Sequence, residues 1–99
     1  MGVNLYLELD GVQADHSPGW NKEVARNLSS IEDSGQFPEN FDPWKDDIPA
    51  SVYYERHIPK LEMFAAECRT RDYEHGAEFY EKMIGEIRAR GSVKVWQYW

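Results

Sequence analysis

The sequence predicts a single α+β domain, with three helices packed on one face of a small sheet formed by the N-terminal and C-terminal strands. Strand-like patterns lie at the two ends of the 99 residues and helical patterns lie between them. This order excludes a doubly wound parallel sheet, in which strands and helices alternate. Hydrophobic residues make up 41% of the chain, which is enough for one core. We therefore treat residues 1–99 as one domain.

The N-terminal strand is predicted over residues 3–9, VNLYLEL, where apolar and polar side chains alternate. A period of two over seven residues is typical of a strand with one buried face. The apolar positions share that face, and they are Val3, Leu5, Leu7 and Leu9. The Asp10-Gly11 dipeptide is a turn signal and ends the strand.

Three helices are predicted between the strands. The first covers residues 18–33, where apolar residues recur at helical spacing. The second begins near residue 50 and is broken near Pro59, because the residue before a proline avoids helical geometry. The third runs from about Asp72 to Arg90 and ends at Gly91.

The C-terminal strand is predicted in SVKVWQYW, which is rich in valine and aromatic residues. We expect it to pair with the N-terminal strand. If Val93 and Val95 join Leu5 and Leu7 against the helices, three aromatic side chains share the opposite face. These are Tyr6, Trp96 and Tyr98. Such a face is either a binding surface or is covered by another part of the chain.

The charge of the chain is acidic and concentrated. Eleven basic and 18 acidic residues give a net charge of −7, which argues against direct binding to nucleic acids or anionic membranes. Six acids and one base lie between residues 32 and 47, so this segment carries most of the net charge. Solubility alone would explain a dispersed acidity, whereas a localised one fits a basic partner.

Residues 32–47 mix these acids with large aromatic side chains and prolines, which exclude a continuous helix. The candidate partner-binding residues here are Phe37, Glu39, Phe41, Asp42, Trp44, Asp46 and Asp47. Acids among aromatics suit a basic, partly apolar protein surface. The alternative is that the aromatics anchor a long loop to the core while the acids face water. The two interpretations are compatible.

No sequence motif fixes a reaction. Cys68 lies on an apolar helical stripe and is interpreted as a core residue. The histidines, His16, His57 and His75, do not form a metal-binding motif. A run of carboxylates at helical spacing, Glu74, Glu78 and Glu81, would fit either a divalent ion or a solvated helix face. We therefore expect no catalytic residues, no metal and no cofactor.

Three functions remain as hypotheses. The first is a small acidic protein-binding module, for example an inhibitor or adaptor of a nucleic-acid-handling enzyme, that docks through residues 32–47. The second is a metal-dependent hydrolase that uses helix-borne carboxylates. The third is a structural subunit that assembles through its sheet edge, which would make it a homodimer.

The expected location is the cytoplasm. A single cysteine excludes an internal disulfide, and the chain has neither a signal-peptide pattern nor 18 consecutive apolar residues for a membrane span.

Overall fold

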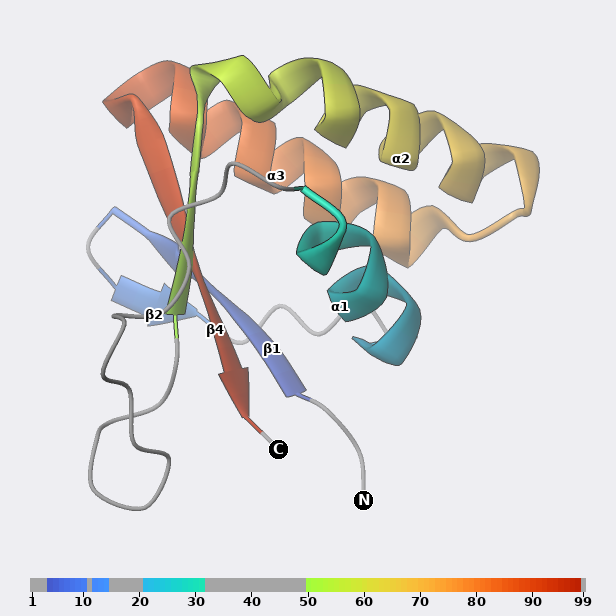
Figure 1. Ribbon diagram of the computed structural model, residues 1–99, viewed down its shortest axis with the longest axis horizontal. Coiled ribbons are helices and arrows are strands. Elements are labelled where there is room, and N and C mark those ends of the chain that lie inside the picture. The colour runs from blue at the N-terminus through green and yellow to red at the C-terminus, as the bar shows by residue number, and fades with distance from the viewer. Residues whose placement is uncertain (1–3, 11, 15–20, 32–49, 99) are drawn as a thin grey trace.

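The computed structural model describes residues 4–10, 12–14, 21–31 and 50–98. The fold is α+β, as predicted, with three helices among the described residues and a four-stranded sheet (Figure 1). In chain order the elements are β1 (Asn4–Leu9), β2 (Val12–Ala14), α1 (Asn21–Ser29), β3 (Ala50–Tyr54), a 3₁₀ turn (Glu55–His57), α2 (Ile58–Thr70), α3 (Glu74–Arg90) and β4 (Ser92–Tyr98).

The sheet is antiparallel, with the strand order β2-β1-β4-β3. The predicted pairing of the N-terminal and C-terminal strands is confirmed: in the register of β1 and β4, Tyr6 lies opposite Trp96 and Leu7 opposite Val95. These two strands occupy the middle of the sheet, because β2 pairs with the outer side of β1 and β3 with the outer side of β4. The sheet is therefore larger than the two-stranded one expected.

The prediction that helix begins near residue 50 is wrong, because Ala50–Tyr54 form strand β3. Burial alternates along it, with Ser51 and Tyr53 buried and Val52 and Tyr54 half-buried. Valine and tyrosine favour a pleated, half-buried surface, and β4 supplies backbone partners for the strand. Pro59 then lies in the first turn of α2, where its missing N–H costs nothing. The proline marks the start of a helix instead of a break within one.

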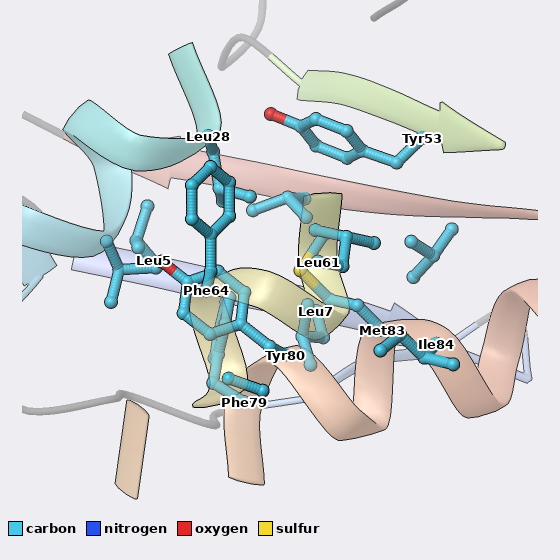
Figure 2. Close-up of a cluster of buried hydrophobic side chains, with 14 of the residues drawn as sticks. Leu5, Leu7, Leu28, Tyr53, Leu61, Phe64, Phe79, Tyr80, Met83 and Ile84 are labelled. Carbon is cyan, nitrogen blue, oxygen red and sulfur yellow. The ribbon is translucent and has the colours of Figure 1, made fainter. Parts of the chain in front are cut away.

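The core lies between the sheet and the helices. Leu5 and Leu7 are fully buried, so the prediction that they face the helices is confirmed. Val93 and Val95 of β4 share this inner face, at 2% and 0% exposure. Figure 2 shows Leu5 and Leu7 among large side chains from α2 and α3. Those labelled are Leu61, Phe64, Phe79, Tyr80, Met83 and Ile84.

Two glycines of α3 have opposite surroundings. Gly76 is buried beside the α2–α3 turn, and a Cβ there would lie 2.6 Å from Tyr73 Cδ1 and 2.9 Å from Cys68 Sγ. Contacts below 3.0 Å are too short for real side chains, so only glycine lets the helix pack this closely. Gly85 is exposed, and a Cβ there would meet nothing within 4 Å.

The end of β1 is tied to the end of α3. Asp10 follows β1 with a φ of 59°, a left-handed conformation that aspartate tolerates better than most residues. Its backbone N–H donates to Glu86 Oε1 at 3.0 Å. Arg90 forms ion pairs with Asp10 and, at 2.9 Å, with Glu86. Gly91, at a φ of 89°, ends the helix as predicted.

Candidate functional site

The face of the sheet that points away from the core carries a mixed aromatic and charged surface. We call it the outer sheet face, and the six large side chains described on it are Tyr6, Glu8, Val52, Tyr54, Lys94 and Trp96. All six are partly exposed, in alternation with buried neighbours on the same strands. The register sets Tyr6 directly beside Trp96, and it aligns Glu8, Lys94 and Val52 in one row across three strands.

Glu8 satisfies the polar groups at the centre of this face. Trp96 Nε1 donates to Glu8 Oε2 at 3.3 Å, and Lys94 Nζ lies 3.6 Å from the same oxygen. Lys94 also lies 5.6 Å from the centre of the Trp96 ring, within the range of a cation–π contact. The indole N–H and the ammonium thus both have partners within the sheet. The side chains of Tyr6 and Trp96 nevertheless stay partly exposed.

The β3 end of the face is fixed by the 3₁₀ turn. The guanidinium of Arg56 lies 4.6 Å from the centre of the Tyr54 ring. The backbone N–H of Tyr54 donates to Nδ1 of the buried His57 at 2.9 Å. Nδ1 of His57 is thus the acceptor of this hydrogen bond. This hydrogen bond occupies a backbone donor at the end of the edge strand.

The structure brings together some of the predicted site residues. Tyr6 and Trp96 lie side by side, as the alternation predicted. Tyr98 lies opposite Asn4 in the backbone register, but its side chain is not among those described. The candidates of the acidic segment lie outside the described residues; they are Phe37, Glu39, Phe41, Asp42, Trp44, Asp46 and Asp47.

Sequence reasoning missed Val52 and Tyr54, because residues 50–58 were assigned to a helix. The signal that would have found them is the alternation in SVYY. The same assignment hid the role of His57, which is buried beneath the end of β3 and packs edge-on against Tyr53 at 5.9 Å between ring centres.

The other chemical candidates are accounted for by packing and ion pairs. Cys68 is buried, and burial together with the nearby negative charge of Glu23 raises the pKa of its thiol. Two of the α3 carboxylates face Arg69 of α2: Arg69 Nη2 lies 2.5 Å from Glu81 Oε1, and Arg69 Nε lies 4.0 Å from Glu74 Oε2. In residues 4–10, 12–14, 21–31 and 50–98, no three histidine, cysteine or acidic side chains converge as a metal site would require.

Comparison with known proteins gives no match to a family model, to a curated protein or to a solved structure. None of the described helices has the length and apolar character that a membrane span needs.

Proposed function

We propose that this protein is a non-enzymatic protein-binding module that docks through its outer sheet face. The observation that carries the proposal is the Tyr6–Trp96 pair: two large aromatic side chains, adjacent across the central strands, that are only partly buried. Aromatic residues are enriched in protein interfaces because they supply a large contact area for little loss of conformational entropy. The hydrogen bond from Trp96 to Glu8 keeps the indole in place before a partner arrives.

The partner in this proposal has a basic, partly apolar surface. The acidic segment 32–47 precedes β3 in the chain, and Asp47 is only three residues before Ala50. Ala50 in turn lies opposite Trp96 in the sheet. Chain connectivity therefore links the acidic residues to the strand beside the aromatic pair. A basic partner would gain contact area from the rings and faster association from the acids.

An inhibitor or adaptor of a nucleic-acid-handling enzyme is the concrete form that we favour. Such enzymes hold phosphates in basic grooves, and a localised acidic segment would compete for the same groove. The proposed location is the cytoplasm.

The test is a comparison of matched variants in partner capture. Immobilised wild-type protein is used to isolate partners from the native host, and the captured partner is then titrated against Trp96→Ser, Tyr6→Ser and the control Met63→Ser. Met63 lies on α2 and is 43% exposed, so it tests the loss of an apolar side chain elsewhere. We expect Trp96→Ser to weaken binding by about 2 kcal/mol, roughly 30-fold, and Met63→Ser to leave it unchanged.

The contribution of the acidic segment is measured separately, through association rates. Combined replacement Asp42→Asn, Asp46→Asn and Asp47→Asn should slow association at low salt and flatten its salt dependence. If binding is equally strong in all variants, the outer sheet face is not the docking surface.

The alternative functions have weaker support among the described residues. Assembly through a sheet edge would use β2 or β3, the two outer strands of the described sheet. β2 is only three residues long, and on β3 the Tyr54 N–H already donates to His57. A metal-dependent hydrolase would use the carboxylates of α3, and Glu81 and Glu74 lie against Arg69 instead of around a shared centre.

A further inference from the structure

A shallow groove runs between α2 and α3 on their solvent side, with a volume of about 590 Å³. The two helices lie side by side and antiparallel (Figure 1). The floor of the groove is apolar and made mainly of small side chains, namely Ala65, Ala66, Ile84 and Gly85. Ala66 and Gly85 are exposed. Because these two residues are small, the backbone of another helix could approach α2 and α3 closely along this apolar strip.

Both helices carry the same spacing of charges around these floor residues. On α2, Glu62 and Arg69 are seven residues apart and flank the alanine pair. On α3, Glu81 and Arg88 are seven residues apart and flank Ile84-Gly85. Seven residues are close to two helical turns, so the two charges on each helix lie on one face.

Because the helices are antiparallel, the two charge pairs meet at opposite ends of the groove. Arg88 Nη2 lies 3.7 Å from Glu62 Oε1 at one end, and Arg69 Nη2 lies 2.5 Å from Glu81 Oε1 at the other. All four side chains are 43–65% exposed. The charges at the four corners of the groove therefore alternate in sign. Each end of the groove has one acidic and one basic side chain, and so does each helix.

An alternating pattern of four charges is complementary to itself. When a second copy is placed face to face by a two-fold axis in the plane of the helices, every acidic corner meets a basic corner. This holds whether the axis runs along the helices or across them. The apolar strips then lie against each other at the centre, where small side chains allow a close helix approach. A symmetric dimer requires this kind of self-complementary patch.

We propose that this groove is the interface of a homodimer, in which α2 and α3 of one copy pack against α2 and α3 of the other as two stacked helix pairs. The outer sheet face belongs to a different surface and stays free in this dimer, so the proposal is independent of the docking function above. Each helix pair presents a face of about 20 × 20 Å, or roughly 400 Å². That is about half the area of a standard interface per partner, so the dimer is weak and forms only at high protein concentration.

The first experiment is sedimentation equilibrium of the full chain from about 10 μM to 1 mM, at low and high salt. We expect the apparent mass to rise from 11.6 kDa toward twice that value at high concentration, with weaker association in high salt. A mass that stays at one chain at 1 mM would overturn the proposal.

The matched variants are Gly85→Lys and His75→Lys. A Cβ at Gly85 meets nothing within 4 Å in the single chain, so the monomer tolerates the lysine while the groove is filled. His75 is exposed on the same helix but does not line the groove, and its replacement adds the same charge. We expect Gly85→Lys to weaken the dimer at least about tenfold and His75→Lys to leave it unchanged. Equal weakening by both variants, or by neither, would overturn the proposal.

A charge exchange tests the corner pattern itself. The double variant Glu62→Arg, Arg88→Glu keeps the ion pair within the chain but inverts one end of the groove. In a mixed dimer with the wild type, two of the four corner contacts then join like charges, for either direction of the axis. Labelled wild-type protein should therefore bind the variant about threefold to tenfold more weakly than it binds itself at low salt. Equal affinities would show that the corners do not meet across an interface.

Discussion

The two faces of the sheet come from one alternating pattern and end in opposite environments. Leu7 and Tyr6 are neighbours on β1, yet Leu7 is fully buried under the helices and Tyr6 is partly exposed beside Trp96. On the inner face, stability comes from removing apolar area from water. On the outer face it comes from cross-strand pairs and from Glu8, which links Trp96 and Lys94. The inner face therefore holds the fold together, whereas the outer face stays partly exposed to solvent.

Truncation of the two neighbours on β1 tests the difference between the two faces most directly. Leu7→Ala should lower the free energy of unfolding by about 3 kcal/mol, because it removes fully buried methyl groups and leaves a cavity. Tyr6→Ala should cost less, about 1 kcal/mol, since it loses a cross-strand aromatic pair at a partly exposed position where no closed cavity is left. Urea denaturation of both variants measures the difference. Equal losses would mean that the outer face is packed as tightly as the core.

The second test compares a buried and an exposed position on α3, Gly76 and Gly85. Gly76→Ala should lower the free energy of unfolding by about 2 kcal/mol, since the new methyl group would overlap the buried ring of Tyr73. Gly85→Ala is the matched control. It should raise stability by up to about 1 kcal/mol, because alanine is the better helix former and its Cβ meets nothing. Thermal and urea unfolding of both variants would check the opposite signs.

The smallest expected effect concerns Tyr53, an inner-face side chain with a polar end. Burial raises its pKa to about 12, and the nearby Ser51 hydroxyl lowers it slightly. That hydroxyl does not reach hydrogen-bonding geometry, and Tyr53 Oη has no hydrogen-bond partner among the described residues. The unfolded chain releases this proton near pH 10 and the folded one near pH 12. The stabilisation from the protonated hydroxyl is thus present below pH 10 and is lost as the pH rises toward 12.

The variant Tyr53→Phe isolates this effect. At pH 7 it should change stability by less than about 1 kcal/mol, because it removes a buried hydroxyl that lacks a partner. At pH 11 the wild type should have lost about 1.4 kcal/mol more than the variant. Urea denaturation at pH 7, 9 and 11 gives both numbers. Identical pH profiles for the two proteins would show that Tyr53 ionises equally in the folded and unfolded states. Burial also raises the pKa of Tyr80, so the stability of both proteins falls further at high pH by the same amount.

The sequence predicted those parts of the fold that a local period determines. Alternation in residues 3–9 placed Leu5 and Leu7 in the core and Tyr6 outside it, and valine at positions 93 and 95 located the second central strand. Residues 50–54 were misread because a short apolar run before a proline fits either a strand or a helix start. The three residues of β2 are too few to show a period.

The candidate site was predictable in part for the same reason. Alternation set Tyr6 and Trp96 on one face, but their adjacency depends on the register between strands far apart in the chain. The hydrogen bond from Trp96 to Glu8 depends on that register as well, since a slip of one residue would move every side chain of the strand to the opposite face of the sheet. The groove between α2 and α3 depends on how two helices cross, which neither helix specifies alone.

The position of β1 in the sheet has a consequence for how the chain is made. β1 precedes the other described strands in the chain, yet its central partner, β4, is synthesised only after β3 and the three described helices. Until then β1 and β3 each lack the neighbour that lies between them, and Leu5, Leu7 and Tyr53 have no closed core. Such a nascent chain exposes unpaired strand edges and apolar surface, which promote aggregation. The late, long-range closure of this sheet would make the protein a slow folder and a candidate client for chaperones during synthesis.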